Sequence, residues 1–334
     1  MKIVIPDDYQ DMVDQLACFS LIRHHDVTRY RAPAASFEQL VERLCDAEVV
    51  VAIRERVTFS RALLERLPKL RLLALVGRGA STIDFSACTE LGIPVSTGKS
   101  NSATAPAELT LALMLAARRN IAREAERMKR GDWPCTLSHR LRGSTLGIFG
   151  LGAIGSLEAE AGRGMGMKIL AFGRDKTAEK ARAAGYEVAP SKAGLFEHSD
   201  VLSLHVRLTA ETRGIVGPQD LARMKPTALI VNTSRAPLIE RGALVEALRA
   251  GRPGFAAVDV YEEEPLRDTT HPLLNMPNVI CTPHLGYVTR DEYELQFTDI
   301  FDQITAYAAG KPTNVVNPDV VKSAVQSLLQ AAES

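Results

Sequence analysis

Short apolar runs alternate with longer segments of mixed polarity from the first residues of this 334-residue chain. Runs rich in Val, Ile, Leu and Ala are typical of strands buried on both faces, and the segments between them have the length of helices. This alternation predicts a parallel sheet covered by helices. The strands expected in the first hundred residues are Lys2–Ile5, His25–Tyr30, Glu48–Ile53 and Arg71–Val76, and the expected helices include Ser36–Cys45 and Ser60–Leu67.

A second α/β unit follows a segment rich in Ala, Leu and Arg. This segment, Ala103–Arg130, has no internal glycine and predicts one long helix, and Asp291–Ala309 before Gly310 predicts another. We therefore expect an α/β fold with two doubly wound parallel-sheet domains, Rossmann- and flavodoxin-like, and a cleft between them. The strands expected in the second unit are Thr145–Phe149, Met167–Phe172, Glu187–Ala189, Val201–His205, Ala228–Asn232, Phe255–Asp259 and Val279–Cys281, with a helix over Gly242–Ala250.

A glycine-rich turn gives the second unit its first chemical signal. Gly150, Leu151, Gly152, Ala153, Ile154 and Gly155 spell G-x-G-x-x-G directly after an apolar run. The glycines permit a tight turn and let the backbone approach a pyrophosphate, which the helix N-terminus attracts. The motif alone is weak, but a second apolar run after a helix-length gap completes a β-α-β unit. A dinucleotide site is thus favoured over a structural turn.

The choice between NAD and NADP depends on the end of the second strand of this β-α-β unit. An acidic residue about 20 positions after the glycine turn normally binds the ribose hydroxyls of NAD. Gly173, Arg174 and Asp175 stand there instead. Arg174 suits the 2′-phosphate of NADP, whereas a register shift of two residues would place Asp175 on the ribose and restore NAD. The balance leans modestly to NADP.

Composition and charge exclude several other classes of protein. Hydrophobic residues make up 46% and charged residues 24%, which is ordinary for a soluble globular protein, and 40 basic residues balance 40 acidic ones. Without a basic run we expect no nucleic-acid partner, and without a long apolar stretch no membrane span. The five cysteines are scattered without metal-ligand spacing, so we expect no metal and a reducing cytoplasm. They are Cys18, Cys45, Cys88, Cys135 and Cys281.

Polar segments follow three expected strands of the second unit, namely Val231–Arg235, Asp259–Leu266 and Thr282–Gly286. Ligands of open α/β sheets bind outside the carboxyl ends of strands, so these segments are expected to meet at one crevice. In the first unit, the turn Val76–Ala80 contains two glycines whose neighbouring N–H groups suit an anion. A plain strand-to-helix turn is the alternative interpretation.

These motifs, in this order, resemble the D-isomer-specific 2-hydroxyacid dehydrogenases. The resemblance runs from about Asp46 to Pro318 and includes Gly77–Asp84, the glycine motif, His205, Asn232–Arg235, Glu264-Pro265-Leu266 and Pro283-His284. It implies an enzyme that interconverts a small 2-keto acid and a D-2-hydroxy acid by hydride transfer with NAD or NADP. It also implies a homodimer formed through Ala103–Arg130 and Asp132-Trp133.

The resemblance further implies a catalytic set of Arg235, Glu264 and His284. His284 would exchange a proton with the substrate oxygen, Glu264 would orient the imidazole and favour its charged form, and Arg235 would pair with the substrate carboxylate. The implied cofactor-binding residues are Gly150, Gly152, Ala153, Ile154, Gly155, Arg174, Asp175, His205, Thr212, Thr233 and Asp259. The implied substrate-binding residues are Arg78, Gly79 and Ala80. Arg54 follows an expected strand, so the order along the sheet makes it a weaker candidate for the same crevice, with a surface salt bridge as the alternative.

The implied domains are 1–102 plus 287–334 for the substrate and 103–286 for the dinucleotide. Two departures leave roles open: Ala236 follows the arginine where the family usually has glycine, and Arg207 interrupts the family's His-x-Pro-Leu-Thr run. Formate dehydrogenases of the same fold typically carry glutamine at the Glu264 position, and a cofactor-sensing corepressor is an alternative from another class. The side chain of the substrate stays undetermined, with Tyr9, Arg54 and Tyr287 as candidates to contact it.

Overall fold

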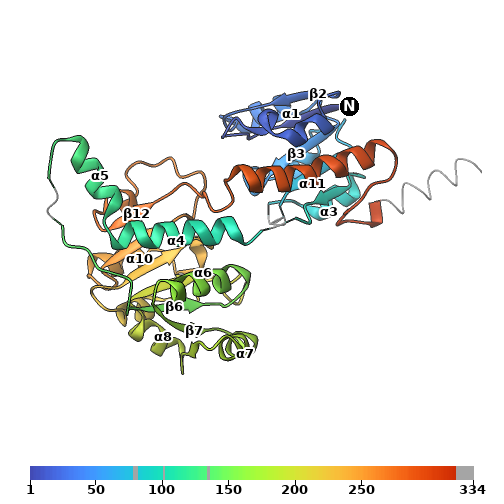
Figure 1. The fold of residues 1–334 in the computed structure, drawn as a ribbon. Helices are drawn as coiled ribbons and strands as arrows, with labels where there is room; N and C mark the ends of the chain where they lie inside the picture. Colours follow the sequence, from blue (N-terminus) through green and yellow to red (C-terminus); the bar gives the residue numbers. More distant parts are fainter. Residues whose placement is uncertain (78–81, 101, 134–135, 321–334) are drawn as a thin grey trace, which may run out of the picture. The chain divides into compact units, whose positions relative to one another are not determined.

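The computed structural model describes residues 1–77, 82–100, 102–133 and 136–320. It divides into two compact units, Met1–Ser102 with Thr289–Ser334, and Ala103–Val288, which are described separately below (Figure 1). Each unit is built around a parallel sheet, so the expected α/β class is confirmed.

The first unit contains a five-stranded parallel sheet in the order β2-β1-β3-β4-β5. Its central strands pair Val49 to Ile53 with Leu72 to Val76, and all ten of these residues are buried because helices cover both faces. The side-chain oxygens of Ser36, Asp84 and Thr289 cap three of the helices. The elements are β1 (Lys2–Ile5), β2 (Asp26–Arg29), α1 (Phe37–Leu44), β3 (Val49–Ile53), α2 (Arg61–Leu64), β4 (Leu72–Val76), α3 (Phe85–Glu90), β5 (Val95–Thr97) and α11 (Arg290–Ala308), with the short helices η1 (Val13–Gln15) and η2 (Ala17–Leu21).

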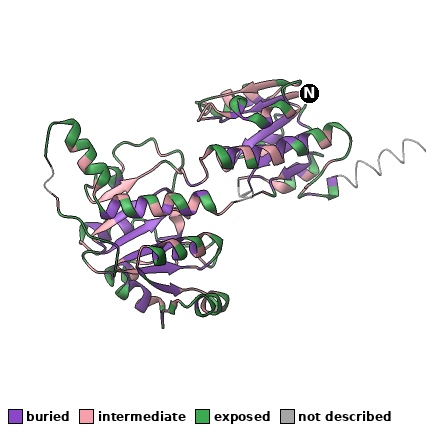
Figure 2. Cartoon of the chain, viewed as in Figure 1, coloured by how far each residue is buried: buried purple, intermediate pink, exposed green. Residues whose placement is uncertain are grey.

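The second unit contains a seven-stranded parallel sheet in the order β12-β11-β10-β9-β6-β7-β8. One apolar core packs α8, α9 and α10 against one face, and another packs α4 and α6 against the other, which leaves the central strands buried and the edge strands β8 and β12 less so (Figure 2). The strands are β6 (Thr145–Phe149), β7 (Lys168–Phe172), β8 (Glu187–Val188), β9 (Val201–Leu204), β10 (Leu229–Asn232), β11 (Phe255–Val258) and β12 (Val279–Cys281). The helices are α4 (Thr104–Arg118), α5 (Ile121–Lys129), α6 (Ala153–Gly164), α7 (Asp175–Ala183), α8 (Lys192–His198), α9 (Pro218–Ala222), η3 (Ala236–Leu238), α10 (Ala243–Arg249) and η4 (Pro272–Asn275).

Strand order reverses at one point in each sheet, and this point positions the loops of interest. In the second unit β6 lies between β7 and β9, and in the first unit β1 lies between β2 and β3. The chain leaves neighbouring strands toward opposite faces there, which opens a crevice at the carboxyl edge. The glycine turn follows β6, so the sheet order places it at such a point.

The expected single helix over Ala103–Arg130 is wrong. α4 ends at Arg118 and α5 begins at Ile121, because Asn120 has φ 54°, in the left-handed region that asparagine tolerates better than most residues. None of the residues of α5 is buried, so no core contact holds it in line with α4. The short strand β5 was not expected from the sequence, and the other strands match within one or two residues.

Candidate functional site

The three polar segments of the second unit leave adjacent strands at the carboxyl edge of its sheet. β10, β11 and β12 are neighbours, and Asn232, Val258 and Cys281 are the last residues of the three strands. Parallel pairing puts the residues that follow them on one edge. The expected meeting of Arg235, Glu264 and His284 in this region therefore has a direct basis in the topology.

An imidazole and a carboxylate form the central pair of this edge. The Nδ1 atom of His284 lies 2.5 Å from Oε2 of Glu264, and the two side chains are 23% and 32% exposed. The backbone N–H of Tyr261 donates to the other carboxylate oxygen, Oε1, at 2.8 Å. With Nδ1 held by Glu264, Nε2 is the imidazole nitrogen left to face a substrate.

The protonation of Glu264 follows from these contacts. Burial by itself would raise the pKa of this carboxyl group, but the hydrogen bond and charge of His284, the Tyr261 N–H and the charge of Arg235 lower it below its ordinary value. Glu264 is therefore an ionised acceptor at neutral pH. That state orients the imidazole and stabilises a proton on it.

Asp259 fixes the loop that carries His284. Its side chain is fully buried and accepts hydrogen bonds from the Thr282 hydroxyl at 2.5 Å and from the N–H groups of Leu285 and Gly286 at 2.8 and 3.0 Å. Burial is the main cause that raises the pKa of this carboxyl group, while these donors and His284 oppose the rise. The carboxylate thus faces its own loop, and a contact with a nicotinamide amide stays a prediction.

Asn232 shapes the turn that presents Arg235. Its side-chain oxygen accepts from the Ser234 N–H at 3.1 Å, and its amide nitrogen donates to the Arg235 carbonyl at 3.1 Å. The guanidinium of Arg235 donates to the Ser234 carbonyl at 2.8 Å. The hydroxyl oxygen of Thr233, the residue after Asn232, lies 2.6 Å from the hydroxyl oxygen of Thr110 in α4. The turn is therefore tied both to itself and to a neighbouring helix.

Close backbone contacts make the glycine turn tight. Gly150 has φ 99°, and a Cβ atom on Gly155 would lie 2.5 Å from the Gly150 carbonyl oxygen, so both positions need glycine. Around Gly152, by contrast, no described atom lies within 4 Å of a Cβ position. Open space beside the first turn of α6, where Ala153 and Ile154 lie, fits the close approach of a phosphate group to the helix N-terminus.

His205 lies behind this turn with its side chain only 3% exposed. Its imidazole is engaged by Glu158 of α6 and Ser203 of β9, so any contact with a cofactor would have to come from its backbone. Sequence reasoning missed Glu158, which occupies an otherwise apolar helix face. Thr212, a predicted cofactor ligand, closes its own loop through its hydroxyl, which donates to the Arg207 carbonyl at 2.7 Å.

The end of β7 lies where the sequence predicted it. Phe172 pairs with Phe149, so the strand is in register with β6 and ends before Gly173. A Cβ atom on Gly173 would lie 2.6 Å from the Thr177 hydroxyl. Thr177 therefore fills the space that an acidic side chain at position 173 would need. Arg174 is exposed and precedes α7, which begins at Asp175; the side chain of Asp175 lies outside the described structure.

The first unit holds one described member of the predicted substrate set. Arg54 follows β3 with φ 56°, and its guanidinium would lie 2.5 Å from a Cβ atom on Gly77, so glycine makes room for it. The predicted ligands Arg78, Gly79 and Ala80 lie outside the described residues. The role of Arg54 in substrate binding therefore stays a prediction.

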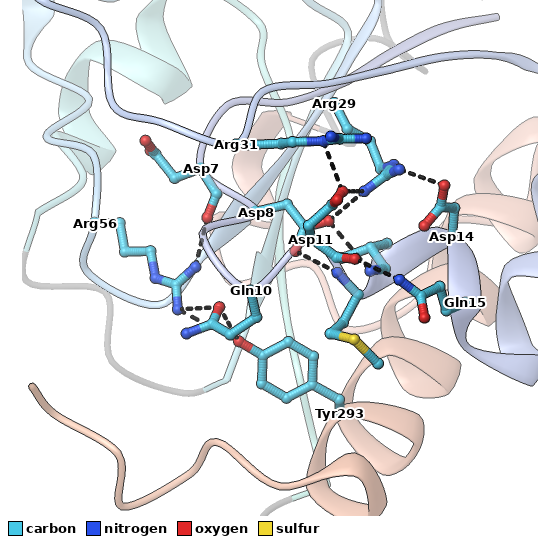
Figure 3. Close-up of polar contacts among 12 residues, drawn as sticks. Asp7, Asp8, Gln10, Asp11, Asp14, Gln15, Arg29, Arg31, Arg56 and Tyr293 are labelled. Atoms are coloured by element: carbon cyan, nitrogen blue, oxygen red, sulfur yellow. Dashed lines mark hydrogen bonds and ion pairs between the residues drawn. The ribbon is translucent and has the colours of Figure 1, made fainter.

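Sequence reasoning missed a cluster around Arg56 at the strand-order reversal of this sheet (Figure 3). The guanidinium donates to the Asp7 carbonyl at 2.5 Å, to the Gln10 side chain at 3.0 Å and to the Tyr293 hydroxyl at 3.3 Å, and it stacks 4.5 Å from the Tyr9 ring centroid. Burial raises the pKa of the Asp7 carboxyl group. Arg56 thus joins the loop after β1 to α11.

Three aspartates that form ion pairs with Arg29 complete the set of polar contacts in Figure 3. The guanidinium pairs with fully buried Asp8 at 2.5 Å, with Asp11 at 3.1 Å, and with Asp14. Asp8 also accepts from two backbone N–H groups at the start of η1. These contacts fix the loop after β1, on which the candidate residue Tyr9 lies.

Comparison with known proteins identifies the family. The family model described as "D-isomer specific 2-hydroxyacid dehydrogenase, NAD binding domain" matches residues 111–286, which contain the glycine turn and the His284–Glu264 pair. The chain belongs to the D-isomer-specific 2-hydroxyacid dehydrogenase family. It is thus an oxidoreductase that uses a nicotinamide dinucleotide to interconvert 2-keto acids and D-2-hydroxy acids.

Similar proteins carry several substrate names. A glyoxylate reductase of Aeropyrum pernix is 37% identical over 316 residues, which cover 90% of this chain and 92% of that protein. A D-3-phosphoglycerate dehydrogenase of Methanocaldococcus jannaschii is 39% identical over 283 residues, 84% of this chain but only 53% of that protein. The crystal structure of a putative D-3-phosphoglycerate dehydrogenase from Ralstonia solanacearum has a TM-score of 0.92 and 47% identity, covering 96% of this chain and 97% of its own.

Two kinds of feature are absent from the described residues. No group of three or more His, Cys, Asp or Glu side chains is arranged to hold a metal ion in the part of the chain that the structure describes. Among the described helices, none is both long enough and apolar enough to cross a membrane.

Proposed function

We propose that this enzyme reduces a small 2-oxo acid to the D-2-hydroxy acid with His284 as the proton donor. The observation that carries the proposal is the 2.5 Å contact between His284 Nδ1 and Glu264 Oε2 at the same sheet edge as Arg235. The carboxylate sets the tautomer, so Nε2 carries the proton that the substrate oxygen receives. Arg235 would bind the substrate carboxylate and polarise the adjacent carbonyl group, a task that suits a planar guanidinium.

The cofactor and the protein supply different parts of the reaction. When bound, the reduced dinucleotide supplies the hydride that adds to the carbonyl carbon. The chain supplies the proton to the carbonyl oxygen, so the ketone gains two hydrogen atoms and His284 is left neutral. In the reverse direction the neutral imidazole accepts the hydroxyl proton. Glu264 stabilises the charged imidazole in both directions.

The test is a spectrophotometric assay at about 340 nm, where reduced nicotinamides absorb, combined with chiral chromatography of the product. Glyoxylate, hydroxypyruvate, pyruvate and phenylpyruvate would each be supplied with NADH and with NADPH; pyruvate, hydroxypyruvate and phenylpyruvate give chiral products. The proposal predicts oxidation of the dinucleotide with at least one acid and a D-product. Formation of an L-product, or dinucleotide binding without turnover of any 2-oxo acid, would contradict it.

We further propose a preference for NADP. Support comes from Gly173, which replaces the ribose-binding acid and packs on Thr177, and from exposed Arg174, which suits a 2′-phosphate. Arg174→Gln should raise the KM for NADPH about tenfold, as expected for one lost charge-assisted contact, and leave the KM for NADH within about twofold. Arg182→Gln, at an exposed position of α7, the helix that follows Arg174, is the control. Equal effects of Arg174→Gln on both dinucleotides would contradict the preference.

We also propose a homodimer that covers the surface around α5. Large apolar side chains are exposed there in the described structure, with Ile121 at 56%, Met128 at 60%, Trp133 at 79% and Leu137 at 98%. Such a concentration marks an interaction surface, and two-fold dimers are the commonest assemblies. Sedimentation velocity should give a dimer for the wild type and a monomer for Met128→Asp. Leu295→Asp, at a 44% exposed position of α11, is the control.

A further inference from the structure

The strongest buried polar feature outside the catalytic pair joins α6 to the end of β9. Glu158 is fully buried, and its Oε2 lies 2.5 Å from Nε2 of His205, whose side chain is 3% exposed. The hydroxyl of Ser203 lies 2.9 Å from the same nitrogen. The second carboxylate oxygen of Glu158 has no hydrogen-bond partner among the described residues. A buried carboxylate carries a large desolvation cost, so its place beneath the glycine turn needs a reason.

This pair lies directly against the turn. The carbonyl oxygen of His205 lies 2.9 Å from the position of a Cβ atom on Gly150, and its imidazole carbon Cδ2 lies 3.4 Å from that of Gly155. The His205 N–H donates to the Phe149 carbonyl at 2.8 Å, which fixes the backbone beside the last residue of β6. A shift of His205 would therefore push directly on two of the three glycines.

The charge of Glu158 also bears on the dinucleotide site. Glu158 lies on the helix whose N-terminus faces the position of the pyrophosphate, where an unpaired carboxylate would repel the phosphates through the low-dielectric interior. The hydrogen bond to His205 gives the buried carboxyl group of Glu158 a partner, whichever of the two groups donates. The pair can thus brace the turn beside the position of an anionic ligand.

We infer that Glu158 is a positioning residue for the dinucleotide, acting through His205 on the glycine turn. It touches neither cofactor nor substrate, so its effect falls on cofactor affinity and not on the chemical step. The inference rests on the proposed function only in requiring that the chain bind a nicotinamide dinucleotide.

The experiment compares Glu158→Met, which keeps the chain length and removes the hydrogen bond, with Glu158→Gln, which keeps a hydrogen-bonding group. Fluorescence titration with NADH and with NADPH gives the Kd, steady-state assays give kcat and KM, and thermal unfolding gives Tm. Glu158→Met should raise the Kd of both dinucleotides about tenfold, or about 1.4 kcal/mol, with kcat at saturating cofactor within about twofold. Glu158→Gln should restore the Kd to within about threefold of wild type.

Two further variants make the result specific. Glu160→Met makes the same change at an exposed position of the same helix and should leave the Kd unchanged. Ser203→Ala removes the other contact of the imidazole without adding volume, and it should raise the Kd about threefold. This variant tests the inference even if Glu158→Met yields little folded protein. A lower Tm with an unchanged Kd in Glu158→Met, or in Ser203→Ala, would overturn the inference. A wild-type chain that binds neither dinucleotide would overturn the proposed function as well.

Discussion

Glu264→Gln removes one charge from the His284–Glu264 pair and preserves its shape. The Glu264 carboxylate lies 2.5 Å from His284 Nδ1. Burial would raise the pKa of this carboxyl group, but the contact with His284 is the main cause that lowers it below its ordinary value. By reciprocity, the same attraction favours the protonated imidazole that reduction requires. Glutamine keeps the side-chain shape and offers its single oxygen to Nδ1, so the tautomer survives while the charge and the hydrogen bond from the Tyr261 N–H do not.

The magnitude follows from the environment of the pair. A hydrogen bond to a charged group contributes about 1.5–3 kcal/mol. The two side chains are 23% and 32% exposed, so solvent screening places this pair near the lower end, at about 1.5 kcal/mol. That energy corresponds to about a factor of ten in rate. The pH above which reduction declines should therefore be lower in Glu264→Gln, and activity on the alkaline side should fall about tenfold.

The assay is the pH profile of kcat/KM for reduction and for oxidation. In reduction, activity is lost as pH rises, and the variant should lose it at lower pH while approaching wild-type activity in acid. In oxidation, activity appears as pH rises, and the variant should gain it at lower pH. Glu263→Gln, at an exposed neighbouring position, is the control. An unchanged midpoint with an equal loss at every pH would refute the electrostatic role.

Three further outcomes follow from the second unit. Gly152→Ala should leave Tm unchanged, because the space there is open, yet raise the dinucleotide Kd at least about tenfold by filling the pyrophosphate position; an unchanged Kd in titration would count against it. Asp259→Ala leaves two backbone N–H groups unpaired and should cost about 3 kcal/mol in unfolding free energy together with most activity, measured by denaturant titration and assay. Burial opposes ionisation of Asp200, but Lys225 lowers its pKa, so its contribution to stability is complete above about pH 4 and is lost as pH falls through that lower pKa; Asp200→Asn should lower Tm more at pH 7 than in acid.

Local sequence pattern predicts most of this fold because the central strands of both sheets are buried on both faces. Continuous apolar runs such as Val49–Ile53 leave little choice of structure, and the strands they form meet their neighbours in parallel. The break at Asn120 escaped prediction because helix propensity on both sides is high and one left-handed residue decides it. The three-residue strand β5 is too short for a periodic signal.

The site residues that directly follow strands could be predicted from the sequence. The contacts between residues far apart in the sequence could not. Arg235 and His284 follow parallel strands of one sheet, so their shared edge is implied by parallel order. The contact between Glu158 and His205 joins residues 47 positions apart, and nothing in the pattern of α6 says which strand its inner face meets. Arg56 and Tyr293 lie 237 positions apart and meet only because α11 returns to the first unit.

His284→Gln offers the most direct test of the proposed role of this residue. Steady-state reduction of the preferred 2-oxo acid would be measured beside a fluorescence titration of the dinucleotide. Loss of the general acid should lower kcat by roughly 10²–10⁴-fold, while the dinucleotide Kd stays within about twofold because the glycine turn is untouched. A variant that retains more than about a tenth of the wild-type kcat would contradict the assignment of His284 as the proton donor.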